Sequence, residues 1–177
     1  MQFTIENVLR VRPDVFWQLF FDTAYNEGLY RELRFDSYEV LELERRDDGY
    51  VRRKLRAVPP LSGPDFLKKQ LRGLVYYVEE GHYDPALDLW TFENHTSLKA
   101  GTTQVTGTIR LAPHPEGTLQ RVDLDVRVSA LGLGGIVERQ IEKGTRESYR
   151  VAAAYANRYA AEHGLLVAPA EGAPAPK

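Results

Sequence analysis

The sequence predicts an α+β domain in which a curved antiparallel β-sheet wraps around one long C-terminal helix. Two observations lead to this expectation. Apolar and polar residues alternate in successive short runs, most clearly in 102–112 and 118–130, and this period of two is typical of half-buried antiparallel strands. The segment 133–163 instead repeats its apolar residues with the period of a helix. Only this segment is long enough to cover the apolar face of such a sheet, and that face must be buried against another element.

The N-terminal part predicts one strand followed by two short helices. The strand is expected in the weakly alternating run 2–11. Pro13 suits the first position of a helix, because the missing N–H of proline would have no partner there anyway. Asp22 or Thr23 can cap a second short helix, which Gly28 weakens.

The centre of the chain predicts two hairpins and a short helix. Asp48-Gly49 lies between two strand-like runs, and this dipeptide is a strong hairpin signal. A second hairpin is expected from the runs 74–84 and 87–97. Between the hairpins, DFLKKQLRG (65–73) predicts a short amphipathic helix.

A glycine-rich turn, with Gly132, Gly134 and Gly135, separates the last strand from the long helix. Phosphate-binding loops also lie between a strand and a helix. However, a Rossmann loop belongs to a βαβ unit of a parallel sheet, and a Walker loop would need Lys where this chain has Ile136. We therefore expect these glycines to let the chain reverse onto the concave face of the sheet, without binding a nucleotide.

These features together resemble the START-like superfamily, also called SRPBCC or helix-grip, which includes polyketide cyclases, pollen-allergen-like proteins and lipid-transfer domains. The resemblance rests on VSALGLGGIVE (128–138) before a long helix and on RPDVFWQLF (12–20) with its helix pair. It covers roughly residues 2–163. It is closest to an uncharacterised bacterial branch, with some likeness to sterol-transfer VASt domains. The resemblance implies a helix-grip fold with a deep cavity between sheet and long helix, used for apolar ligands.

The predicted ligand-binding residues are those expected to face that cavity. On the long helix, small residues lie between bulky ends, which either leaves space for a ligand or lets the helix pack closely on the sheet. On the strands, aromatic residues share one face and could equally form a plain core. The predicted set is Arg53, Tyr77, Trp90, Phe92, Val105, Ile109, Leu124, Val126, Val137, Ile141, Gly144, Ser148, Ala152 and Tyr155.

Arg53 lies two residues from Val51 and two from Leu55. Because side chains alternate between the two faces of a strand, this spacing places Arg53 on the apolar face. An arginine there needs a charged partner or a ligand anion. Glu79 and Glu93 are the candidate partners. The alternative is a local bulge that turns Arg53 towards solvent.

The sequence predicts no catalytic residue, no metal and no cofactor. It contains no cysteine, and its four histidines are scattered without metal-ligand spacing. Glu93 and His95 share one strand face, either as an acid–base pair or as an ordinary surface pair.

Charge and composition bear on partners and location. A net charge of −2 argues against a nucleic-acid partner, and the absence of a signal peptide and of a long apolar run favours a cytoplasmic protein. Basic residues outnumber acidic ones in 45–72, which suits either a transient contact with an anionic membrane or an ordinary solvated hairpin. We expect one START-like domain over 1–165 and a disordered Ala/Pro-rich tail over 166–177.

The leading hypothesis is a non-catalytic module that binds or transfers an apolar small molecule, such as a lipid, a sterol or a polyketide-like compound. Two alternatives remain. One is an enzyme of the polyketide cyclase or aromatase type, in which Arg53, Tyr77, Glu93 and His95 would be the residues to test. The other is a protein-interaction module with a filled core.

Overall fold

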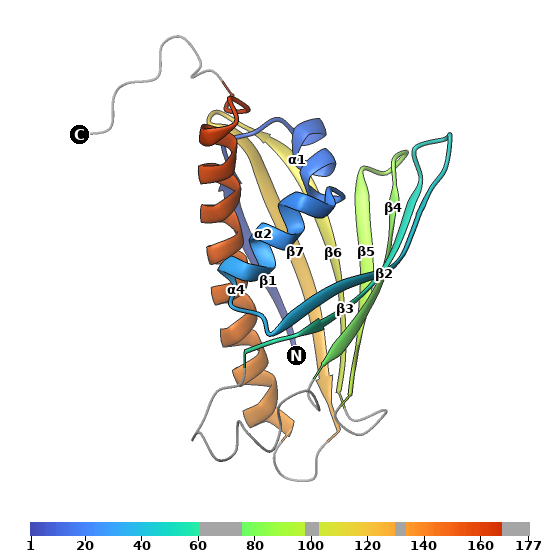
Figure 1. The fold of residues 1–177 in the computed structure, drawn as a ribbon. Helices are drawn as coiled ribbons and strands as arrows, with labels where there is room; N and C mark the ends of the chain where they lie inside the picture. The colour runs from blue at the N-terminus through green and yellow to red at the C-terminus, as the bar shows by residue number, and fades with distance from the viewer. Residues whose placement is uncertain (61–75, 98–102, 130–133, 168–177) are drawn as a thin grey trace, which may run out of the picture.

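The computed structural model describes residues 1–60, 76–97, 103–129 and 134–167. Figure 1 shows these elements as a curved sheet beside one long helix. In chain order they are β1 (Gln2–Leu9), α1 (Pro13–Phe20), α2 (Thr23–Glu32), β2 (Ser37–Arg45), β3 (Val51–Val58), β4 (Tyr77–Asp84), β5 (Leu89–Thr96), β6 (Thr103–His114), β7 (Gly117–Val128) and α4 (Gly134–Glu162).

The described strands form one antiparallel sheet of seven strands in the order β1-β7-β6-β5-β4-β3-β2. The first two strands of the chain are therefore the two edges of the sheet, and α1 and α2 connect them. Helix α4 lies along β1 and β7, on the side towards which the sheet curves (Figure 1). The predicted α+β helix-grip fold is confirmed.

The two short helices begin where the sequence predicts. Pro13 opens α1. The side chain of Asp22 caps α2, since its Oδ1 accepts a hydrogen bond from the backbone N–H of Tyr25 at 2.7 Å. Gly28 lies against Tyr155 of α4, and a Cβ at this position would force the hydroxyl end of that side chain to shift.

The long helix agrees with its predicted range to within one residue at each end. It is followed by Gly164 with φ of +68°, a conformation in which glycine commonly ends helices. At the other end, Gly134 and Gly135 are already helical. They therefore do not form the predicted reversal, and Gly132 lies outside the described residues.

The C-terminal segment stays in contact with the domain beyond α4. Leu165 and Leu166 pack against the core, and the backbone N–H of Val167 donates to the carbonyl of Arg10 at 3.0 Å. The first two residues of the predicted tail thus touch the domain. Residues 168–177 lie outside the described residues, as does the helix predicted over 65–73.

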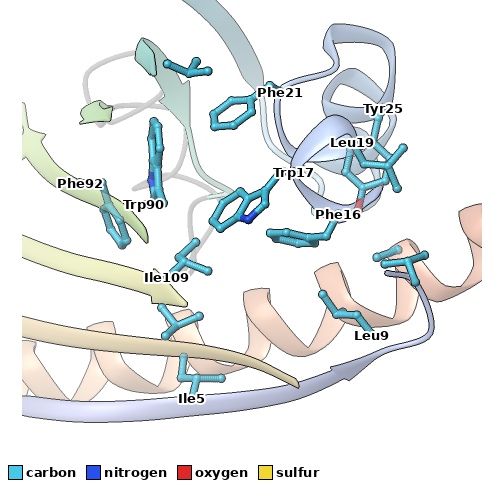
Figure 2. Packing of buried hydrophobic residues seen from close by; sticks show 14 of the residues in the cluster. Ile5, Leu9, Phe16, Trp17, Leu19, Phe21, Tyr25, Trp90, Phe92 and Ile109 are labelled. Carbon is cyan, nitrogen blue, oxygen red and sulfur yellow. The ribbon is translucent and has the colours of Figure 1, made fainter. Parts of the chain in front are cut away.

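The core joins α1 to the concave face of the sheet. Figure 2 shows Trp17 between Phe16 and Phe21, with Trp90 of the sheet facing this group. The indole Nε1 of Trp17 donates to Oδ1 of Asp88 at 2.6 Å, and this oxygen also accepts from the hydroxyl of Tyr83 at 2.8 Å. These contacts fix α1 over one end of the sheet, because they tie the helix to the β4–β5 turn.

Replacement of glycine by alanine is expected to change the free energy of unfolding in opposite directions at two positions. A Cβ at Gly81 would overlap the ring of Trp90 and lie 2.9 Å from the carbonyl oxygen of Thr91. Because Trp90 is buried, Gly81→Ala is expected to lower the free energy of unfolding by roughly 1–3 kcal/mol. A Cβ at Gly144, on α4, would meet nothing within 4 Å, so Gly144→Ala is expected to stabilise by about 0.5–1 kcal/mol. Urea unfolding of both variants measures this, and equal effects would contradict it.

Candidate functional site

A cavity of about 290 Å³ lies between the concave face of the sheet, the two short helices and α4. The apolar part of its sheet wall is supplied by Trp90, Phe92, Val105, Ile109 and Leu124. Helix α4 supplies Thr145, Ser148, Tyr149, Ala152, Ala153 and Ala156, and α1 and α2 supply Phe16, Phe20, Tyr25, Asn26, Leu29 and Tyr30. The cavity is thus lined by residues from the N-terminal, central and C-terminal parts of the chain.

Most of the residues predicted to bind a ligand lie around this cavity. Those that line it are Arg53, Tyr77, Trp90, Phe92, Val105, Ile109, Leu124, Ser148 and Ala152. Val126 is also on the concave face and is fully buried, but it belongs to the core and not to the cavity wall.

The remaining predicted residues lie on α4 and do not line the cavity. Val137 is exposed, and so is Gly144. Ile141 packs against the core, and Tyr155 packs against the rings of Tyr25 and Tyr159. The cavity-facing residues of α4 therefore lie about one position closer to the C-terminus than the predicted stripe.

Tyr149 is the largest cavity residue on α4 that the sequence did not reveal. It lies directly after Ser148, which belongs to the predicted stripe of small residues. The helix positions directly after that stripe also face inward, since Thr145, Tyr149 and Ala153 line the cavity. Of the small residues in that stripe, Ser148 and Ala152 border open volume, whereas Gly144 is exposed.

Arg53 is a buried member of the cavity wall, with only 4% of its surface exposed. Its Nη1 donates to the carbonyl of Phe20 at 2.7 Å and its Nη2 to Oε1 of Glu79 at 3.0 Å. The guanidinium also lies over the ring of Phe20, 4.4 Å from its centroid. The alternative that a bulge turns Arg53 to solvent is therefore wrong, since the only register shift of this hairpin is in β2, between Val40 and Glu42.

Further polar side chains gather around the Arg53–Glu79 pair. Asn94 on β5 is the direct cross-strand partner of Glu79, and Tyr30, Tyr77 and Tyr149 line the same cavity. Burial is the main cause that raises the pKa of each of these three tyrosine hydroxyls, so they stay protonated at neutral pH. We call the six residues Arg53, Glu79, Asn94, Tyr30, Tyr77 and Tyr149 the polar cluster.

Glu93 and His95 lie away from the cavity. They alternate along β5 with Trp90, Phe92 and Asn94, so they belong to the opposite face of the sheet. His95 Nδ1 is 3.8 Å from Oε1 of Glu93, and both side chains are exposed. They form a surface pair and cannot act on a ligand inside the cavity.

The described residues contain no group of three or more His, Cys, Asp or Glu arranged to hold a metal ion. Likewise, no helix within the described ranges is long and apolar enough to span a bilayer.

In the described part of the basic segment 45–72, Arg46 pairs with Glu44 and Lys54 with Glu80. The rest of that segment, 61–72, lies outside the described residues.

Residues 4–159 match the family described as a protein of unknown function, DUF2505. The chain belongs to the DUF2505 family. No curated protein sequence matches this DUF2505 chain significantly.

Solved structures show the fold that this DUF2505 chain shares with other proteins. TTHA0849 from Thermus thermophilus is 20% identical over 92% of this chain and 99% of that protein, with a TM-score of 0.65. Ara h 8.0201 is 13% identical over 88% of this chain and 97% of its own, with a TM-score of 0.60. The di-domain ARO/CYC StfQ from the steffimycin biosynthetic pathway is 13% identical over 92% of this chain and 46% of its own, with a TM-score of 0.56.

These likenesses show that the chain has the predicted helix-grip fold. At such low identity they do not identify a ligand or a reaction. The likeness to VASt domains stays a prediction.

Proposed function

We propose that the chain binds an apolar small molecule in the cavity between the sheet and α4. The observation that carries this proposal is the combination of an open volume of about 290 Å³ with largely apolar walls and one cluster of polar groups. Ligand sites are typically concave and apolar, with few polar groups that fix the orientation of the ligand. A protein-interaction module with a filled core would have no reason to keep such a space.

The cavity favours a compact ligand. Its volume is at the lower end of the range of roughly 300–1,000 Å³ that is common for small-molecule sites. A small polycyclic compound or a chain of medium length suits this space better than a large lipid does. Among the ligand classes that the sequence suggests, a polyketide-like aromatic compound therefore fits best.

A cyclase-type enzyme is a second candidate function, supported by the buried polar cluster and by the fold shared with StfQ, an ARO/CYC protein by name. Of the four residues that the sequence suggests for this role, only Arg53 and Tyr77 line the cavity. Glu93 and His95 are on the outer face, so proton transfer would have to use the polar cluster instead.

Binding of naphthalene tests the proposal directly, because naphthalene is compact, apolar and uncharged. We expect isothermal titration calorimetry to show saturable binding of one naphthalene per chain. The same titration in urea above the unfolding transition is the control and should show no saturable binding. If the folded chain binds no naphthalene, and native mass spectrometry of the purified protein finds no bound small molecule, the cavity is not a ligand site.

A further inference from the structure

We propose that the cavity selects ligands with a neutral hydroxyl group, an alcohol or a phenol, and rejects carboxylates. The hydroxyl would bind within the polar cluster, between Tyr149 on α4 and Asn94 on β5. This inference rests on the proposed function, because it specifies the chemistry of a ligand in the same cavity.

The charges of the cavity wall compensate each other. Among the described lining residues, Arg53 and Glu79 are the only ionised side chains, and they pair with each other. Both terminal nitrogens of Arg53 are already engaged, Nη1 by the carbonyl of Phe20 and Nη2 by Glu79. Arginine binds a carboxylate best through two parallel N–H groups, and here one N–H of each terminal nitrogen is already used within the protein.

A ligand carboxylate would also meet an unfavourable environment. It would share a small apolar cavity with the carboxylate of Glu79, and two like charges at short distance repel strongly where water is excluded. The three tyrosine hydroxyls nearby are neutral and could not compensate the second charge. A fatty acid or another carboxylate is therefore a poor ligand for this site.

The polar cluster nevertheless has unused hydrogen-bonding capacity. Oδ1 of Asn94 and Nε of Arg53 are buried atoms without a hydrogen-bond partner in the described part of the chain. The hydroxyl of Tyr149 forms no hydrogen bond with another described residue. Buried polar groups are rarely left unpaired in folded proteins, which indicates that a ligand completes this cluster.

A hydroxyl group matches the unused groups better than a carbonyl does. Asn94 Oδ1 can only accept a hydrogen bond, whereas the hydroxyl of Tyr149 can donate one. A ligand hydroxyl can donate to the first and accept from the second, but a ligand carbonyl can only accept. The last torsion of an asparagine side chain is soft, so the amide of Asn94 can rotate to present Oδ1 to the ligand.

Three probes of one shape test this inference: naphthalene, 2-naphthol and 2-naphthoate, titrated at neutral pH by calorimetry. We expect 2-naphthol to bind roughly tenfold more tightly than naphthalene, as one net hydrogen bond would give, and 2-naphthoate to bind more weakly than naphthalene. Asn94→Leu and Tyr149→Phe are each expected to lower the affinity for 2-naphthol towards that for naphthalene, while naphthalene still binds. Tyr50→Phe, at the β2–β3 turn and outside the cavity wall, is the control and should leave all three affinities unchanged.

The outcomes separate this inference from the proposed function. If none of the three probes binds, the proposed function itself fails. If naphthalene binds but 2-naphthol is no better, or if 2-naphthoate binds most tightly, the cavity is a ligand site and only the selection for a hydroxyl is wrong. Equal loss of naphthalene and 2-naphthol binding in Tyr149→Phe would also contradict the inference, because it would show a role in packing alone.

Discussion

Replacing Arg53 with methionine is expected to lower the free energy of unfolding by about 3–5 kcal/mol, because the change leaves Glu79 as an uncompensated buried charge. The side chains of Arg53 and Glu79 are only 5% and 14% exposed. Methionine fills a similar volume, so the cost arises from the charge and not from a cavity. Arg53 also holds the carbonyl of Phe20 at the end of α1, and its loss frees this end of the helix.

Chemical unfolding of matched variants separates these contributions. The double variant Arg53→Met/Glu79→Met is expected to recover most of the lost stability, because no charge is then left unpaired. Lys54→Met is the control: it breaks the neighbouring pair with Glu80, whose side chains are 30% and 38% exposed, and is expected to cost less than about 1 kcal/mol. Equal costs for Arg53→Met and Lys54→Met would show that solvent screens both pairs alike.

The position of Arg53 illustrates what the alternation of side chains along a strand can predict. Its spacing from Val51 and Leu55 placed it correctly on the concave face, and Glu79 was one of its two predicted partners. The same rule places Glu93 and His95 on the face opposite Trp90, which excludes them from the cavity. Alternation along the sequence assigns a strand residue to a face reliably, because a strand has only two faces.

The position of the cavity within that face could not be predicted in the same way. Ile109 and Val126 both point inward and both are buried, yet only Ile109 borders open volume. The difference depends on where α1, α2 and α4 lie over the sheet. That placement follows from contacts distant in sequence, such as the hydrogen bond from Trp17 to Asp88, which no local pattern contains.

Helix α4 shows a second reason for error. A helix presents a continuous range of directions, so residues 144, 148, 152 and 155 and residues 145, 149, 152 and 156 form two neighbouring stripes. The first stripe was predicted to face the sheet, and the second lines the cavity. Ala152 belongs to both stripes, and together with Ser148 it is one of the two predicted helix residues that line the cavity.

Ala152→Phe is therefore expected to weaken naphthalene binding by roughly a hundredfold, about 2.7 kcal/mol. The new ring would extend into the cavity and take up space that the probe needs. Stability should change by less than about 1 kcal/mol, because an open volume accepts the ring, whereas the same substitution in a packed core would cost roughly 1–3 kcal/mol. Calorimetric titration and urea unfolding of the same preparation measure the two effects.

Ala154→Phe provides the matched control, since Ala154 lies on the same helix and is exposed. It introduces the same ring with the same helix propensity, so it should alter neither the affinity for naphthalene nor the stability by a comparable amount. A large loss of stability in Ala152→Phe with unchanged naphthalene binding would place the probe elsewhere and show that α4 packs tightly at this point. If Ala152→Phe loses naphthalene binding but keeps its stability, the probe binds in the space beside Ala152.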